Sequence, residues 1–185
     1  MKRRIVMCAV ALSLALLHSA AVARPVKIGF GGGMSVPVSD AKDAFKNGFH
    51  GQAMVKWEAP VLPLALRASV GYSQLDLKSL APGVDGKGKI LSGLANVSWG
   101  FPVGPVKPYI IAGVGAFNLK SEVGGTSGPS ETKFGIDGGA GVEFKLGGIS
   151  AFVEGKVENI FTDQGLASSQ AFDTMIVPVT FGIFF

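Results

Sequence analysis

Apolar and polar side chains alternate along almost the whole chain after residue 24, and this pattern most constrains the fold. Successive side chains of a strand point to opposite faces of a sheet, so the alternation is typical of strands with one apolar face. In the stretch 133–145, for example, Phe134 and Ile136 alternate with Lys133 and Asp137. We predict eight strands, at 26–36, 49–59, 64–72, 91–101, 107–118, 133–145, 149–160 and 175–185.

The segments between these predicted strands alternate in length. Long polar segments occupy 37–48, 75–88, 119–131 and 161–173, and short ones occupy 60–63, 102–105 and 147–148. Long and short connections in turn are typical of an up-and-down barrel in an outer membrane. The sequence therefore predicts an all-β fold, an eight-stranded antiparallel up-and-down transmembrane β-barrel. An even strand number places both chain ends on the short-turn side, which is the periplasmic side.

The first residues have the three parts of a secretory signal peptide. Lys2, Arg3 and Arg4 form a basic region, an apolar stretch covers 5–17, and Ala21-Val22-Ala23 matches an A-x-A cleavage site. The apolar stretch is short for a membrane-spanning helix. We therefore expect two parts, a cleaved signal peptide at 1–23 and an outer-membrane barrel domain at 24–185. An uncleaved membrane anchor is the alternative.

Removal of the signal peptide changes what the composition implies. The whole chain has 17 Lys and Arg against 13 Asp and Glu, and residues 24–185 keep 14 basic and 13 acidic residues. The basic character therefore gives no reason to expect nucleic acid as a partner. Cys8 is the only cysteine, so the exported part can form no disulfide.

Alternation alone does not say whether the apolar face meets lipid or lines a ligand cavity, as it does in soluble lipocalin-like barrels. Aromatic residues favour the membrane, because they cluster at predicted strand ends as in interfacial girdles. The girdle near the short turns is expected to include Trp57, Trp99, Tyr109 and Phe144. The other face is rich in glycine and in charges of both signs, which suits a narrow, packed, polar lumen. A soluble periplasmic barrel stays the alternative.

Several stretches resemble the late strands of the small bacterial outer-membrane β-barrel proteins, the outer membrane protein β-barrel domain superfamily. They are "KPYIIAGVGAF" at 107–117, "FGIDGGAGVEF" at 134–144, "FVEGKVEN" at 152–159 and "VPVTFGIFF" at 177–185. The resemblance covers essentially all of 24–185 and implies a monomer in the cell outer membrane, with membrane lipid as its surroundings. It also implies that Phe181, Ile183 and Phe185 form the terminal signal read by the barrel-assembly machinery.

Charged residues on the predicted inward face are nearly balanced in sign. An eight-stranded barrel is just wide enough for side chains to fill, so such charges must pair with each other or with water. The expected ion network comprises Lys56, Glu58, Arg67, Asp137, Glu143, Lys145, Glu154 and Lys156, with Lys27, Lys133 and Glu158 on the same face. The resemblance implies that Glu154 and Lys156 belong to an interior network. Arg67 is the expected partner, because a guanidinium can bridge two carboxylates.

Little in the sequence points to catalysis or to a bound cofactor. His50 is the only histidine after the signal peptide, and it lacks the histidine–serine pattern expected of barrels that deacylate lipid A. No Cys and His cluster suggests zinc, and the acidic residues of the loops are too scattered for calcium. The run "GFGGG" at 29–33 lies in a strand pattern with no helix after it, so it is no phosphate loop. We expect no catalytic, metal or cofactor site.

These observations predict an integral outer-membrane protein that serves as a non-catalytic scaffold with four surface loops, in a structural or surface-interaction role. The first alternative is a narrow pore or a barrel that takes up a small solute. A second alternative, from another class, is an enzyme that modifies envelope lipid.

Overall fold

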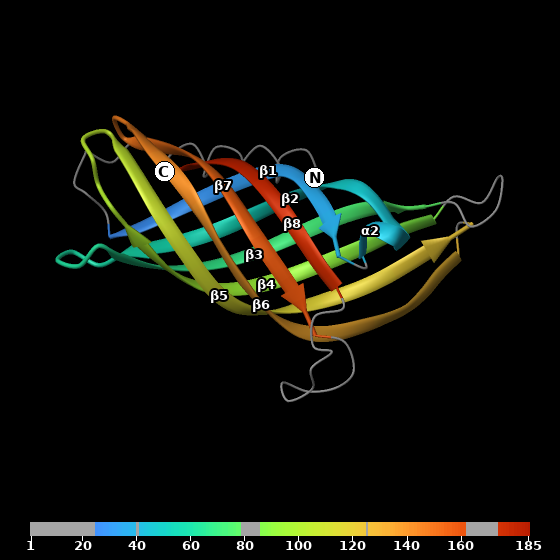
Figure 1. Cartoon of the computed structure of the whole chain (residues 1–185). Coiled ribbons are helices and arrows are strands. Elements are labelled where there is room, and N and C mark those ends of the chain that lie inside the picture. The colour runs from blue at the N-terminus through green and yellow to red at the C-terminus, as the bar shows by residue number, and fades with distance from the viewer. Residues whose placement is uncertain (1–24, 40, 79–85, 125, 162–173) are drawn as a thin grey trace, which may run out of the picture.

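The computed structural model describes residues 25–39, 41–78, 86–124, 126–161 and 174–185. Eight antiparallel strands close into one barrel in chain order, with the first strand paired to the last (Figure 1). The predicted fold class is therefore confirmed, while the predicted signal peptide lies outside the described residues. The elements are β1 (Val26–Val38), α2 (Ala41–Ala44), β2 (Phe45–Glu58), β3 (Leu64–Leu77), β4 (Gly86–Gly100), β5 (Val106–Val123), β6 (Thr126–Leu146), β7 (Ile149–Ile160) and β8 (Thr174–Phe184).

The barrel closes where β1 meets β8, a seam that depends on glycine. The register pairs Gly29 with Phe184 and Gly33 with Thr180. A Cβ on Gly33 would lie 1.9 Å from the carbonyl oxygen of Val179, so only glycine lets these two strands approach so closely. The backbone N–H of Phe185 donates to the carbonyl oxygen of Ile28 at 2.9 Å and ends the seam.

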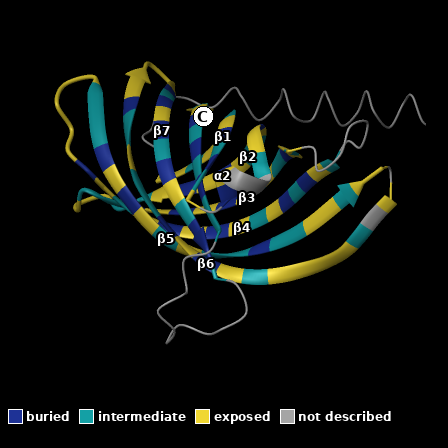
Figure 2. Ribbon diagram, turned by 45° about the vertical axis from the view of Figure 1, so that its right-hand side comes forward, coloured by how far each residue is buried: buried dark blue, intermediate teal, exposed yellow. Residues whose placement is uncertain are grey.

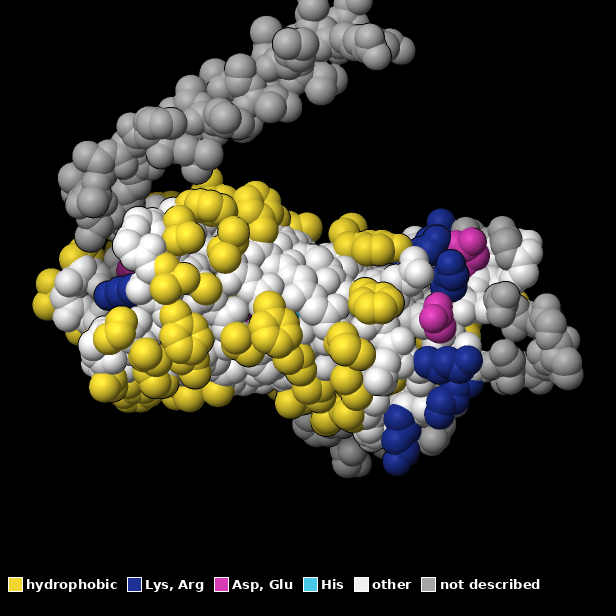
Figure 3. Space-filling view, turned by 90° about the horizontal axis from the view of Figure 1, so that it is seen from above, with side chains coloured by type: hydrophobic (Ala, Val, Ile, Leu, Met, Phe, Trp, Pro, Cys, Tyr) yellow, Lys and Arg dark blue, Asp and Glu magenta, His cyan; other side chains and the backbone are white. Residues whose placement is uncertain are grey.

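Side-chain burial alternates along the strands, as Figure 2 shows by its striped colouring. The outward side chains are apolar and exposed, and they form a band around the barrel, while the charged side chains gather beyond this band at the end of the long connections (Figure 3). An apolar outer band combined with polar inward-facing positions is typical of a barrel whose outer face meets lipid.

The third long connection differs from its prediction. The segment 119–131 is mostly paired strand, because β5 runs on to Val123 and β6 begins at Thr126. Gly124 has φ of 58° and supplies the left-handed turn between them. Residues of this hairpin are mostly polar and do not alternate with apolar ones. The sequence pattern of this stretch therefore resembled that of a loop. Much of the second and fourth long connections lies outside the described residues.

The first long connection contains α2, a single helical turn. Among the described residues, no helix is both long enough and apolar enough to cross a membrane.

The lumen was predicted to be polar throughout, but its half near the long connections contains buried apolar side chains. Buried apolar side chains meet there in one cluster, which we call the apolar plug: Leu75, Ile90, Leu94, Phe117, Ile160 and Ile176. Phe117 and Ile160 are completely buried. The sequence concealed the plug because its members come singly or in pairs from β3, β4, β5, β7 and β8, so the pattern of no single strand shows it. The lumen is therefore partly apolar at the end near the long connections, and polar contacts fill the rest of it.

Candidate functional site

The charged cluster nearest the short turns joins four strands across the lumen. The Nζ of Lys56 on β2 donates to Glu143 Oε2 on β6 at 2.6 Å. Glu58, at the end of β2, lies 2.8 Å from Lys27 Nζ on β1 and 3.0 Å from Lys107 Nζ on β5. Each carboxylate thus meets more than one ammonium group, which offsets part of the cost of removing these charges from water.

Arg67 and Glu154 form a buried ion pair between opposite walls, on β3 and β7. The Nη2 of Arg67 lies 2.7 Å from both carboxylate oxygens of Glu154, and the side chain of Glu154 is completely buried. The hydroxyl of Tyr109 on β5 also donates to Glu154 at 2.8 Å. Three strands are therefore tied together through one carboxylate, in the geometry of a strong charge-assisted contact.

A third group of charges lies between β6 and β7. Lys156 Nζ is 3.3 Å from Asp137 Oδ2 and 3.4 Å from Glu158 Oε1. The amide of Asn96 on β4 donates to the same Asp137 oxygen at 2.6 Å. Lys156 and Asp137 are both nearly fully buried, so their charges are compensated by each other rather than by solvent.

His50 on β2 is held between two hydroxyl groups. Its Nδ1 lies 3.1 Å from Ser35 Oγ on β1, and its Nε2 lies 2.9 Å from Thr180 Oγ1 on β8. No carboxylate hydrogen-bonds to this ring in the part of the chain that the structure describes. A histidine that acts as a catalytic base is usually oriented by a carboxylate, so the arrangement fits a strand-joining role better.

Small cavities lie beside these contacts in the lumen. One cavity of about 10 Å³ is lined by Lys56, Arg67 and Glu143, and another of about 10 Å³ by His50, Lys156 and Thr180. Each is about the size of one water molecule. At these two points the described side chains leave room for about one water molecule each.

The structure places most of the predicted network residues inside the lumen and in contact. Lys145 does not join them, because it is exposed at the end of β6 and no ion pair forms to it within the described part of the chain. Lys27 and Glu158 also make interior ion pairs, and Lys133 lies beside Glu131 at 3.3 Å.

The prediction for Tyr109 was wrong. Its side chain points into the lumen and is 8% exposed, because the register of β5 puts it opposite Gly141, where a missing Cβ leaves room for the ring. Trp57, Trp99 and Phe144 do point outward near the short turns. Phe181, Ile183 and Phe185 face outward too, and their part in assembly stays a prediction.

The predicted ion network omitted three polar residues that bond to its carboxylates. Asn96, Lys107 and the hydroxyl of Tyr109 each bond to a network carboxylate. Asn96 alternates with apolar residues on its strand, so the sequence pattern assigns it to the inward face. Lys107 and Tyr109 lie on β5, and their inward orientation follows only from the strand register. In the described ranges, no three His, Cys, Asp or Glu side chains form a group able to hold a metal ion.

The comparison with known families decides the identity of the fold. Residues 6–163 match the outer membrane protein beta-barrel domain. The chain belongs to this family. It is accordingly an outer-membrane protein of the Gram-negative type.

Solved structures of outer-membrane barrels have the same fold. Neisserial surface protein A is similar with a TM-score of 0.66 and 18% identity, over 87% of this chain and 96% of that one. A major outer membrane protein from Thermus thermophilus gives a TM-score of 0.61 and 18% identity, over 88% and 99%. OprG from Pseudomonas aeruginosa gives 0.50 and 12%, over 86% and 95%. No curated protein matches the chain significantly in sequence.

Proposed function

We propose that this protein is a closed, non-catalytic outer-membrane scaffold whose barrel does not conduct solutes. The observation that carries the proposal is the Arg67–Glu154 pair, which crosses the lumen between opposite walls with both side chains buried. Two cavities in the neighbouring polar layers are each about 10 Å³. A path for ions would require these pairs to separate, and a separated buried charge costs several kcal/mol.

Conductance and leakage test this proposal. Purified barrel, reconstituted in a planar bilayer, is expected to give no steady single-channel steps. Liposomes that contain the protein should release a trapped small solute no faster than protein-free liposomes. Steady steps that disappear in Lys156→Ala or Arg67→Ala would instead show a narrow pore or uptake path and overturn the closed scaffold.

The activity of the scaffold is proposed to lie at the surface, on the hairpin of β5 and β6. This hairpin continues beyond the point where β6 leaves β7, since the last β6–β7 pair joins Gly135 to Ile160. A shortened variant that lacks 121–129 should keep the barrel, because the described residues of this range pair only with the hairpin itself and with β4. Loss of cell adherence with unchanged barrel mobility in gels would support surface interaction, whereas unchanged adherence would favour a purely structural role.

The non-catalytic part of the proposal is supported by the surroundings of His50. Its two ring nitrogens are taken up by Ser35 and Thr180, beside a cavity too small for a lipid. Overexpression should leave the mass spectrum of lipid A unchanged. A new lipid A species that disappears in His50→Ala would overturn this part.

A further inference from the structure

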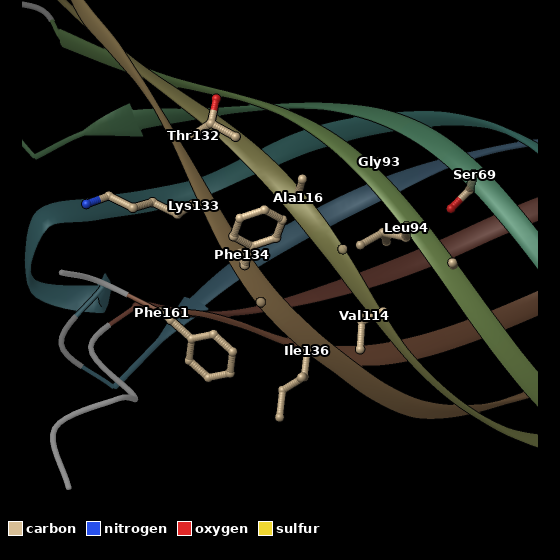
Figure 4. A pocket seen from close by; sticks show the side chains of 13 residues that line it. Ser69, Gly93, Leu94, Val114, Ala116, Thr132, Lys133, Phe134, Ile136 and Phe161 are labelled. Atoms are coloured by element: carbon tan, nitrogen blue, oxygen red, sulfur yellow. The ribbon is translucent and has the colours of Figure 1, made fainter. Parts of the chain in front are cut away.

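A hollow of about 1020 Å³ opens in the outer face of the barrel over β4, β5 and β6, as Figure 4 shows from close by. Two cross-strand rows supply its outward side chains, and its lining also includes Ser69, Leu94, Gly115 and Gly135 from the row between them. In the first row, Gly93 pairs with Ala116 and Ala116 with Phe134. In the second, Ala95 pairs with Val114 and Val114 with Ile136.

Residue size explains the shape of the hollow. Gly93, Ala95 and Ala116 are small, so the surface is low over β4 and the adjoining part of β5. Phe134, Val114 and Ile136 are large and project outward, with exposed fractions of 71%, 60% and 42%. The small residues form a depression beside the large apolar side chains. A slender apolar group fits such a depression, and in a membrane that group is an acyl chain.

Cations lie on the same outer face, farther toward the long connections. Lys89 pairs in register with Lys120, and Lys87 pairs with Glu122. Lys120 is four residues beyond Ala116, and Lys89 is four residues before Gly93, so both are roughly 13 Å along the strands from the hollow. Between them lies an uncharged row in which Asn118 donates to Thr132 at 3.0 Å.

Within the described residues, neither Lys87 nor Lys120 forms an ion pair, although the charge of Glu122 acts on both. Glu122 forms an ion pair with Lys89 and neutralises it. Lys87 and Lys120 are exposed and are diagonal neighbours across β4 and β5, a relation that brings side chains within about 7–8 Å. Asp76 on β3 is opposite Lys87 in register and is a second acid beside these lysines. Two long lysine side chains at this spacing can reach one phosphate group.

We propose that this face is a binding site for a phosphorylated, multi-acyl glycolipid of the outer leaflet, with a chain in the hollow and a phosphate on Lys87 and Lys120. The membrane side supports this occupant, because the lysines lie at the end of the long connections, the outer side in barrels of this family. Basic clusters next to an apolar membrane surface attract anionic lipid headgroups. The site is separate from the lumen, so it does not depend on the scaffold being closed.

Native mass spectrometry of the detergent-solubilised full barrel tests the charged half of the site. Diphosphorylated lipid A is titrated as the probe, with phosphatidylethanolamine and phosphatidylglycerol in parallel. The wild type should bind lipid A most tightly, and Lys87→Gln with Lys120→Gln should weaken it by about 30-fold, since each lysine near a membrane surface contributes appreciably to anionic lipid binding. Lys46→Gln, an exposed lysine on β2, is the control and should bind as the wild type does.

Filling the hollow tests the apolar half. Ala116→Leu should weaken lipid A binding, whereas Ala112→Leu, on the same outer face of β5 but outside the hollow, should not. Each variant must still show the heat-dependent gel shift of a folded barrel, which separates a lost site from a lost fold. Equal binding by the lysine double variant and Lys46→Gln would overturn the proposal. The proposal would also be overturned if the wild-type barrel bound phosphatidylethanolamine as tightly as lipid A, or phosphatidylglycerol more tightly than lipid A.

Discussion

Nη2 of Arg67 lies 2.7 Å from both carboxylate oxygens of Glu154, across the full width of the lumen. The two residues are 87 positions apart in the chain and belong to strands on opposite walls. Removal of one partner leaves the other charge buried without compensation, whereas removal of both does not.

The first prediction follows from this asymmetry. Glu154→Gln should lower the free energy of unfolding by about 3–5 kcal/mol, because it leaves the Arg67 guanidinium buried and unpaired. The double variant Arg67→Met, Glu154→Leu should lose less than the single variant. Urea unfolding in detergent, followed by the fluorescence of Trp57 and Trp99, measures both. A double variant as unstable as the sum of the two single variants would contradict the idea.

The second prediction concerns the hydroxyl of Tyr109, which donates to Glu154. Tyr109→Phe should destabilise the barrel by about 1.5–3 kcal/mol, the range for a hydrogen bond to a charged group. Tyr72→Phe is the matched control, since Tyr72 is 46% exposed on the outer face and should cost little. The same urea assay applies, and equal losses in the two variants would mean that the bond to Glu154 contributes nothing.

The third prediction concerns the closing seam. Gly33→Ala should cost about 3 kcal/mol or more and lower the yield of closed barrel, because its Cβ would overlap the carbonyl oxygen of Val179. Gly155→Ala is the control, as a Cβ there meets nothing within 4 Å. The measurement is the fraction of refolded protein that shows a heat-dependent gel shift. Normal refolding of Gly33→Ala would show that the seam can move apart.

The fourth prediction concerns the apolar plug. Phe117→Ala should destabilise the barrel by about 3–5 kcal/mol, because Phe117 is completely buried and its loss leaves a cavity. Phe134→Ala is the control on the outer face, where the side chain is 71% exposed. Thermal unfolding in detergent compares the two. A Phe117 variant as stable as the Phe134 variant would mean that the plug does not hold the strands together.

The sequence by itself determined the strand order, the alternation and most of the inward charges. A period of two is a local property, so residues such as Lys56, Asp137 and Glu154 can be assigned to one face from their neighbours alone. Connection lengths then supplied the up-and-down topology. The resemblance in the late strands pointed to the same family that the comparisons show.

Only the tertiary structure decided what those inward residues meet. Partners such as Arg67 and Glu154 come from distant strands, and their contact depends on barrel register, which no local pattern encodes. The register of β5 also turned Tyr109 and Phe117 inward, since a strand apolar on both faces carries no local mark of its inner side. The apolar plug formed only when inward residues of five different strands met in the closed barrel. The hollow on the outer face arose in the same way, because small residues of β4 and β5 became neighbours only through strand pairing.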